Sequence, residues 1–338
     1  MSIKQRIPDV ETLRTRLDMA FDRGIADFIA RTDQRRIIVL RNRRLTLLVG
    51  VVFIVSVVLL AIVSQPPTEP WIYQFFAMVL LGLCVATIIF AHRWYQTTKV
   101  LAQEVNLALV PTLTTCLDQL VIYTHHSEHR EETRAQLAKS ELLTERVDTL
   151  AADDRFSFTE PYPTTITELS ASKTVTRGTR SREEQVFSGT FAVVTLPVTL
   201  EGTTFISTEG DQHGFGHRTF WNTLLGNTSY TETELEWNDF ERDLHVATDH
   251  PVEARTILTP DFMQDLHAWW HEHGQNIRIS VRGSSFFLLL PDANIRIGTS
   301  TTSVRPRELK AYSMTVLTPI WRTLTLVEDL QFSNEQVR

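Results

Sequence analysis

Two long runs without a charged residue constrain this chain more than any other feature of its sequence. Leu45 to Val63 covers 19 residues and Trp71 to Ala91 covers 21, and neither run contains Asp, Glu, Lys or Arg. At a rise of about 1.5 Å per residue, each run is long enough to cross a hydrocarbon layer about 30 Å thick. The sequence therefore predicts two membrane-spanning helices, joined by the proline-rich residues 64–70 in a tight hairpin.

Positive charges flank the two runs on their outer sides only. The first flank ends in Arg43 and Arg44, the second carries Arg93 and Lys99, and the connecting loop has no Lys or Arg. Because these charges accumulate on the cytoplasmic side of membranes, we expect both termini in the cytoplasm. The aromatic residues Trp71 and Trp94 stand near span ends, where we expect them to anchor the chain at the lipid headgroups.

Composition excludes some functions for the remainder of the chain. The net charge is -7 and the isoelectric point is near 5.9, which argues against a binder of nucleic acid, because such proteins need a basic surface to contact phosphates. The two cysteines, Cys84 and Cys116, give no indication of a disulfide framework.

The pattern along the chain predicts five segments. Residues 1–44 contain an amphipathic helix, with Asp9 as its N-cap, followed by the basic flank, and this helix packs either on the chain's own helices or on an anionic membrane surface. The transmembrane hairpin covers residues 45–91. The polar residues 92–150 indicate a helical stalk, and residues 151–184, rich in Ser, Thr and charge, indicate a loop-rich linker.

Residues 185–338 show short apolar runs separated by turns, and two helical patterns. The clearest strands are those of residues 276–282 and 285–291, which we expect to form a hairpin around Gly283. Helices are predicted at residues 261–273, with Thr259 as N-cap and Pro260 in the first turn, and at about 306–331. Strands and helices do not alternate regularly, which favours an α+β fold with an antiparallel sheet. The predicted strands are residues 185–198, 203–208, 234–237, 244–248, 276–282 and 285–291.

Metal ligation is one candidate chemistry. His267 and His271 are four residues apart on a predicted helix, so both imidazoles lie on one face, as a zinc site requires. The metalloprotease pattern places Glu directly after the first histidine, but this chain has Ala268 there, so that general base is missing. Asp153 and Asp154 are a second candidate for a divalent cation, with loop or capping residues as the alternative.

Ligand contact is the other candidate role. The segment GDQHGFGHRTFW places His213, His217 and Arg218 where they could contact an anion or a partner, although its glycines lack dinucleotide-binding spacing. Trp269 and Trp270 are further candidates for contact with a ligand or partner, with a core or packing surface as the alternative. No cofactor is predicted.

Three stretches carry a resemblance to a known family: VFSGTF around Gly189, DHPVEARTILTPDFMQDL from Asp249 to Leu266, and AADDRF around Asp153. They resemble the bacterial membrane family known as domain of unknown function 3137, over roughly residues 90 to 332. ELEWNDFERDLHV also resembles that family, but departs from it at Trp237 and Asn238. The resemblance implies paired membrane helices before a cytoplasmic domain, in a bacterial inner membrane, and implies no activity.

Two functions follow as hypotheses. The first is a non-enzymatic inner-membrane protein whose cytoplasmic α+β domain binds another protein, a lipid headgroup or a second copy of itself, with membrane lipids as its other partner. The alternative is a membrane-tethered, metal-dependent hydrolase that uses the His267 helix or the Asp153 pair.

Overall fold

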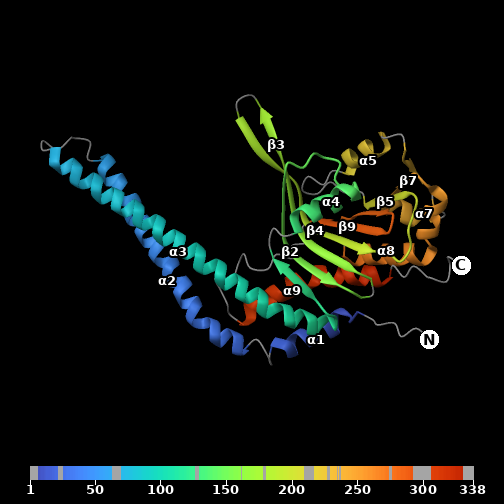
Figure 1. The fold of residues 1–338 in the computed structure, drawn as a ribbon, viewed down its shortest axis with the longest axis horizontal. Coiled ribbons are helices and arrows are strands. Elements are labelled where there is room, and N and C mark those ends of the chain that lie inside the picture. Colours follow the sequence, from blue (N-terminus) through green and yellow to red (C-terminus); the bar gives the residue numbers. More distant parts are fainter. Residues whose placement is uncertain are drawn as a thin grey trace. The chain divides into compact units, whose positions relative to one another are not determined.

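The computed structural model describes most of the chain, and its helices and strands alternate irregularly (Figure 1). The described residues are 7–21, 26–62, 70–125, 129–160, 162–177, 180–208, 217–226, 229–233, 235, 237–273, 276–291 and 306–329. The helices are α1 (Val10–Ala20), α2 (Ala26–Ile62), α3 (Pro70–Leu117), α4 (Arg130–Ser140), α5 (His217–Gly226), α6 (Asn238–Asp243), α7 (Pro251–Ile257), α8 (Pro260–His273) and α9 (Pro306–Asp329). The strands are β1 (Ile122–His125), β2 (Thr149–Phe158), β3 (Thr164–Arg177), β4 (Arg180–Thr195), β5 (Thr203–Thr208), β6 (Thr231–Glu232), β7 (Leu244–Thr248), β8 (Arg278–Arg282) and β9 (Ser285–Pro291).

The chain divides into two compact units. The sheet unit comprises Met1–Arg16, Val110–Arg296 and Ser313–Arg338, and the helical unit comprises Leu17–Leu109 and Ile297–Tyr312. This division differs from the five predicted segments, because α1, α3 and α9 each contribute residues to both units.

The described strands form one antiparallel sheet in the order β1-β2-β3-β4-β9-β8-β5-β7-β6. The predicted α+β class and antiparallel pairing are therefore confirmed. The predicted hairpin is also present, since β8 pairs with β9 around Gly283, whose φ of 57° suits glycine in a tight turn. The predicted strand at residues 234–237 is wrong, because the described residues 235 and 237 lie outside strands and β6 occupies residues 231–232 instead.

The predicted linker at residues 151–184 is wrong, because most of this segment lies in strands β2, β3 and β4. β2 pairs Ala152 with Leu169 and Arg155 with Thr167, so two residues of β2, Asp153 and Asp154, lie opposite one residue of β3. This β-bulge puts Ala152 and Arg155 on the same face of the sheet, whereas residues an odd number apart normally point to opposite faces.

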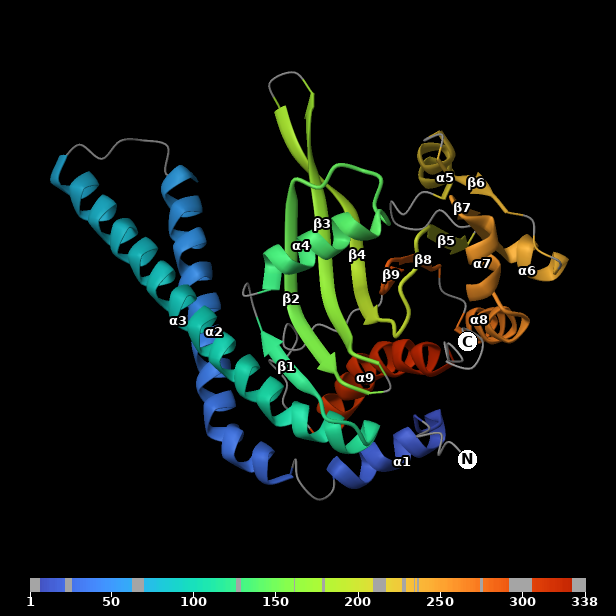
Figure 2. The same cartoon turned by 45° about the vertical axis from the view of Figure 1, so that its right-hand side comes forward.

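The central part of the sheet explains the glycine of VFSGTF. β4 pairs with β9 along Gly189–Thr195, and a Cβ built on Gly189 would lie 2.1 Å from the carbonyl oxygen of Leu290. Only glycine permits this close approach of two backbones. Beyond this region the outer ends of β3 and β4 pair with each other and project past their neighbours (Figures 1 and 2).

One face of the sheet carries a core cluster covered by α4 and α5. Leu137 of α4 and Phe220 of α5 pack with residues of β2, β3, β4, β5, β7 and β9, including Phe205 and Phe287. Arg155 reaches from β2 to α4, where it forms two hydrogen bonds with Glu132. The predicted stalk at residues 92–150 is therefore wrong after Leu117, because this segment forms β1, α4 and part of β2 within the sheet unit.

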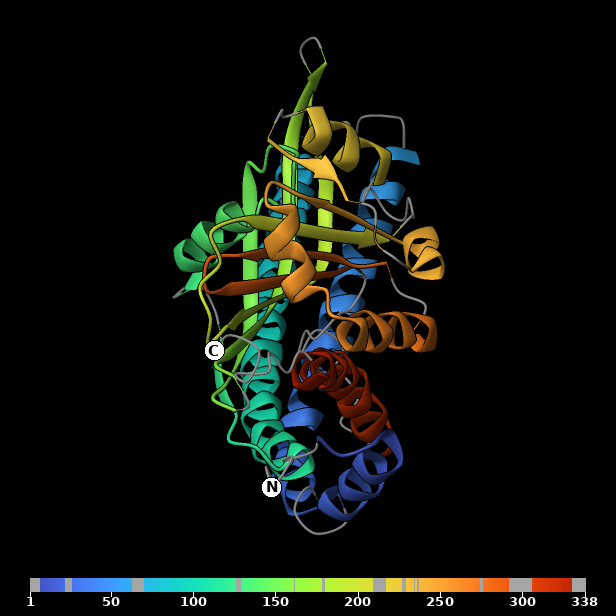
Figure 3. The ribbon, with the colours of Figure 1, turned by 90° about the vertical axis from the view of Figure 1, so that its right-hand side faces the viewer.

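Helices near the two ends of the chain contact each other within the sheet unit. The indole nitrogen of Trp321 in α9 donates to the carbonyl oxygen of Pro8 at 2.7 Å, and that of Trp269 in α8 donates to Arg322 at 3.0 Å. Figures 2 and 3 show α8 beside the C-terminal part of α9. Thus the two helices predicted for this region are confirmed, and the Trp269 ring is a packing element.

Two predicted N-caps are confirmed. The Asp9 carboxylate accepts a hydrogen bond from the Thr12 amide at 2.7 Å, and the Thr259 hydroxyl accepts one from the Phe262 amide at 3.3 Å. The hydrogen bond from the Thr12 backbone amide is the main cause that lowers the pKa of Asp9. In α1, Leu13 and Leu17 are buried, which favours packing within the chain over a membrane-surface role.

In the helical unit, α2 and α3 are long helices that contain the two uncharged runs. Among the described residues, the stretch Gln74–Leu101 of α3 is long and apolar enough to span a membrane. Its most apolar 18-residue window has a mean hydropathy of 2.4, and none of that window is buried. One candidate span is thus found where two were predicted. The end of the first predicted span, Val63, and residues 64–69 of the connecting loop lie outside the described residues.

Candidate functional site

Three side chains of the sheet unit bring their ligand atoms to one point. They are Asp243, the last residue of α6, and His267 and His271 of α8, and their ligand atoms all lie within 4.8 Å of one another. The measured contacts are 3.1 Å between Asp243 Oδ2 and His267 Nε2, 3.4 Å between Asp243 Oδ2 and His271 Nε2, and 3.2 Å between the two Nε2 atoms. We call these three residues the His-Asp cluster.

Local structure positions each member of the cluster. The N-cap Thr259 starts α8, and the four-residue spacing then places His267 and His271 on one face, with ring centroids 4.3 Å apart. Asp243 ends α6, directly before β7, and the Arg242 Nε lies 3.5 Å from its Oδ1. Arg242 therefore contacts one carboxylate oxygen, while the other faces the two imidazoles.

The cluster is partly open to solvent. The side chains of Asp243 and His267 are 17% and 13% exposed, whereas that of His271 is 54% exposed. Burial by itself raises the pKa of Asp243, but the hydrogen bond with His267 and the charge of Arg242 outweigh burial, so the pKa lies below its usual value. The carboxylate is thus in its charged form at neutral pH, which is the form that binds cations.

Aromatic rings surround the two imidazoles. The ring of Trp237 lies 5.0 Å from that of His267, and the ring of Trp270 lies 4.7 Å from that of His271. Trp270 therefore forms part of the wall of the cluster, whereas its neighbour Trp269 is buried and bonded to α9.

Two nitrogen donors and one carboxylate form a donor set that suits a first-row divalent metal and leaves further coordination positions open. In metal-dependent hydrolysis such a position holds a water molecule, and a general base deprotonates it. Glu272 follows His271 in the chain, but its charge acts on Arg322 of α9 and it does not belong to the cluster.

The structure places the two predicted metal-binding pairs, His267 with His271 and Asp153 with Asp154, on different elements. His267 and His271 are brought together, as their spacing predicted. Asp153 and Asp154 lie apart from them, in the bulge of β2, where Asp154 is fully buried and accepts a hydrogen bond from the Tyr123 hydroxyl at 2.6 Å. Asp154 thus belongs to a packed region of the sheet rather than to an open site.

The side chains of the other residues predicted to contact a ligand lie outside the described part of the structure. His213 lies outside the described residues, and His217 and Arg218 begin α5 with side chains outside the described part. Sequence reasoning missed Asp243 and Trp237. The only signal for them was their position in ELEWNDFERDLHV, where a carboxylate precedes a strand, and this gives no distance to a helix 24 residues away.

The predicted membrane anchors lie in the helical unit. Arg43 and Arg44 are exposed on α2, and Trp71 lies in α3 with its side chain outside the described part. The Trp94 Nε1 is buried and has no hydrogen-bond partner among the described residues, which is not the position expected of an interfacial N–H donor.

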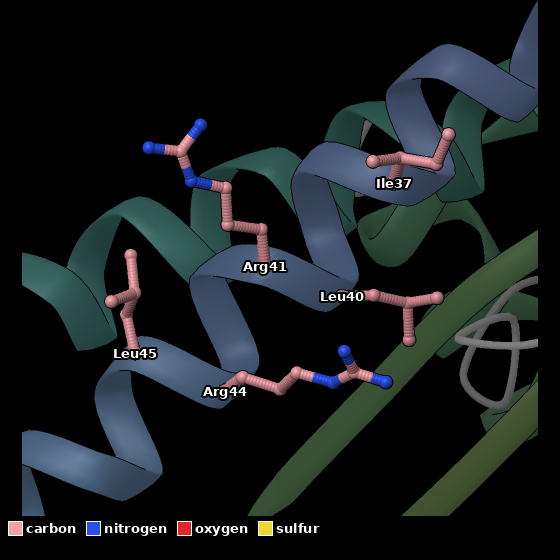
Figure 4. Close-up of a pocket in the computed structure, with 5 residues that line it drawn as sticks. All are labelled: Ile37, Leu40, Arg41, Arg44 and Leu45. Atoms are coloured by element: carbon pink, nitrogen blue, oxygen red, sulfur yellow. The ribbon is translucent and has the colours of Figure 1, made fainter.

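A shallow cavity of about 340 Å³ lies on α2 next to these arginines. Apolar side chains and the stems of two arginines line it, and the two guanidinium groups point in different directions from the helix (Figure 4). The lining residues are Ile37, Leu40, Arg41, Arg44 and Leu45.

Comparison with known proteins gives a family for part of the chain. The family model described as "Protein of unknown function (DUF3137)" matches residues 185–329, which is less than half of the chain and includes all three residues of the His-Asp cluster. The resemblance noted from the sequence is thus supported for this domain, and the match does not extend to the residues before it. No curated protein matches the chain.

One solved structure is similar. It is the crystal structure of the mycobacterial trehalose monomycolate transport factor A, TtfA, which shares 9% identity, with 59% of this chain and 97% of that chain covered, at a TM-score of 0.25.

Proposed function

We propose that this protein is a two-span membrane protein with both termini in the cytoplasm, whose sheet unit binds a protein partner. The observation that carries the first part is the Gln74–Leu101 stretch of α3, which is 28 residues long and whose most apolar 18-residue window has a mean hydropathy of 2.4 and is not buried. Exposed apolar surface of this length is stable in hydrocarbon and unfavourable in water.

The described part of α2 supports a second span. Eight of its apolar side chains between residues 47 and 58 are 41–62% exposed, and this part of the helix carries no charge. The exposed residues are Leu47, Leu48, Val51, Val52, Ile54, Val55, Val57 and Val58. A soluble helix with this surface would need a partner to cover it.

Contacts between α2 and α3 support a hairpin. Arg35 forms an ion pair with Glu104, and the Asn42 side chain lies 3.5 Å from the Thr97 hydroxyl. The polar flank before the first run therefore contacts the polar flank after the second run. This is the arrangement expected when both flanks lie on the same side of a membrane.

The arginines of α2 support a cytoplasmic position for these flanks. Arg41 and Arg44 extend from the helix next to the apolar run (Figure 4), where long side chains can place their stems along lipid and their charges at the headgroups. Anionic lipids on the cytoplasmic face attract such charges. Membrane lipids are accordingly the first partner in the proposal.

The edge of the sheet supports the binding role. In the described part of the chain β1 pairs only with β2, and Leu120 and Ile122 at this edge are 66% and 52% exposed. Unpaired edges with apolar side chains readily accept another strand. We therefore assign β1 as the surface that contacts the protein partner.

Membrane association is tested by washing membranes from cells that express the full chain with alkaline carbonate. The wild type is expected to stay in the pellet until detergent is added. Leu81→Lys combined with Ile88→Lys, both on the exposed surface of α3, is expected to reduce insertion, because each charge at the centre of a span costs about 3 kcal/mol. Leu120→Lys is the matched control outside the span.

Release of the wild type by carbonate would contradict the anchor. A reporter fused after residue 338 tests the topology, because it should be active only in the cytoplasm. The binding role is tested with a photo-crosslinking residue at position 122, which should capture a protein, against position 252, where Val252 is 80% exposed on α7. Equal capture at both positions would contradict the assignment of β1.

A further inference from the structure

No placement of protons on the His-Asp cluster turns all three of its close contacts into hydrogen bonds. The three contacts of 3.1, 3.2 and 3.4 Å form a triangle of Asp243 Oδ2, His267 Nε2 and His271 Nε2. Each contact is favourable only if one atom donates and the other accepts. The ionised carboxylate always accepts, and each Nε2 either carries a proton and donates or carries a lone pair and accepts.

No assignment of protons satisfies all three contacts. If both Nε2 atoms carry protons, both donate to Asp243, but two N–H groups then oppose each other across 3.2 Å. If only one carries a proton, the other Nε2 sets its lone pair against the carboxylate. A second proton on either ring does not help, because a doubly protonated ring carries a proton on each nitrogen and its Nε2 is then a donor.

A bound cation removes this conflict, because Asp243 Oδ2 and the two Nε2 atoms can then all act as lone-pair donors to one ion. For a tetrahedral ion with metal–donor bonds of about 2.05 Å, the separation between donors is about 3.3 Å. The three measured separations lie within about 0.2 Å of that value. The donor atoms thus already have the spacing of three corners of a coordination tetrahedron.

The chemistry of the donors selects the kind of cation. Imidazole nitrogen suits first-row transition metals, whereas Mg²⁺ and Ca²⁺ prefer oxygen donors. Arg242 lies 3.5 Å from Asp243 Oδ1 and favours the orientation in which Oδ2 is the ligand. The 54% exposure of the His271 side chain leaves a path for the ion to enter.

We infer that Asp243, His267 and His271 form a binding site for one first-row transition-metal dication, with Zn²⁺ as the representative ion. The site leaves a fourth position for water or a ligand. This inference is independent of the membrane anchor proposed above, so failure of either one leaves the other in place.

The test uses the full chain in detergent, without a histidine tag, after removal of metal by a chelator. Titration with Zn²⁺ is expected to give one equivalent bound, and Co²⁺ is expected to give the absorption bands of a four- or five-coordinate ion. His271→Ala and Asp243→Asn are expected to weaken Zn²⁺ binding by about 100-fold or more.

The matched control is His245→Ala. His245 Nδ1 lies 3.4 Å from the Glu232 carboxylate in the same unit, so it has one histidine and one carboxylate but no third ligand in the described residues. This variant is expected to bind Zn²⁺ as the wild type does.

Three results would overturn the inference: no stoichiometric binding by the wild type, equal binding by the wild type and His271→Ala, or the same loss in His245→Ala. Circular dichroism shows whether each variant is folded. If His271→Ala were unfolded, His271→Gln would serve in its place, because it keeps the length of the side chain and removes the imidazole ligand.

Discussion

Asp154 and Asp243 are both aspartates of the sheet unit, but their surroundings are opposite in kind. Asp154 is fully buried in the bulge of β2, and its carboxylate accepts a hydrogen bond of 2.6 Å from Tyr123. Asp243 is 17% exposed, and its carboxylate faces two imidazoles whose contacts cannot all be hydrogen bonds. One carboxylate is held by the fold, and the other forms part of an open donor set.

The difference shows which observation separates a structural carboxylate from a ligand. The Asp154 carboxylate accepts a hydrogen bond from the Tyr123 hydroxyl, so donor and acceptor match and its removal disturbs packing. Asp243 contacts groups that match only around a cation, so its removal changes binding. Neither burial nor charge alone makes this distinction, whereas the pattern of donors and acceptors does.

The largest expected effect is that of Asp154→Ala. Loss of the buried carboxylate leaves the Tyr123 hydroxyl without this acceptor and should lower the free energy of unfolding by about 3 kcal/mol. For a domain of this size that corresponds to a fall in melting temperature of about 6–12 °C. Thermal unfolding of the full chain in detergent measures it.

Asp153→Ala is the control for that variant, because the Asp153 side chain lies in the same bulge and is only partly buried. It should cost less than about 1 kcal/mol. If the two variants were equally stable, the description of Asp154 as a carboxylate held by the fold would be wrong.

Tyr123→Phe should have an intermediate effect. It removes the hydroxyl donor but keeps the ring, which packs 5.2 Å from that of Phe156. The expected loss is about 1.5 kcal/mol, because the buried Asp154 side chain loses one hydrogen-bond donor. Combining it with Asp154→Ala should add little to the loss from Asp154→Ala alone, and full additivity would show that the two residues are not coupled.

Glu132→Gln should have a smaller effect that depends on pH. The hydrogen bond with Arg155 is the main cause that lowers the pKa of Glu132, outweighing burial. Its stabilisation is therefore present above the unfolded-state pKa of about 4.3 and is lost as the pH falls through the lower folded-state value. Because Glu132 is 53% exposed, we expect a loss below about 1 kcal/mol.

Melting temperatures of the wild type and Glu132→Gln, compared at pH 7 and near pH 3, test this prediction. The two proteins should differ at pH 7 and converge in acid. A difference that grew in acid would mean that Arg155 stabilises the protein through another partner.

The smallest expected effect on stability is that of His271→Ala in the absence of metal. The side chain is 54% exposed and its contacts are not all favourable, so the free energy of unfolding should change by less than about 0.5 kcal/mol. A loss of stability as large as that of Asp154→Ala would show that the His-Asp cluster stabilises the fold.

The local parts of the fold could be predicted from the sequence. Alternation in residues 276–282 and Gly283 predicted the β8–β9 hairpin, and Thr259 with Pro260 predicted the start of α8. These features depend on neighbouring residues, whose side chains and backbone alone favour the observed structure.

The strands β2 and β3 could not be predicted in this way. The bulge at Asp153 and Asp154 interrupts the two-residue period, and β3 is rich in Ser and Thr, so the segment has the composition of a loop. Their stability comes from pairing with distant strands, which no local pattern records.

The candidate site was predictable only in part. The four-residue spacing of His267 and His271 placed two ligands, because it depends on one helix. The third ligand, Asp243, comes from another helix and depends on how α6 and α8 pack. Tertiary packing of this kind leaves no regular spacing in the sequence.

The extra residue in β2 changes which residues of the strand face each side of the sheet. Leu150 and Ala152 precede it and share a face with Arg155, so the even-numbered residues after it, such as Phe156, point to the opposite side. Deleting one of the two bulge residues would leave Ala152 and Arg155 two positions apart in a regular strand, so Arg155 would still face Glu132 and Phe156 would still face the opposite side. A relative that lacks the extra residue would therefore show unbroken two-residue alternation through this strand, with its charged and aromatic positions still on the same sides of the sheet.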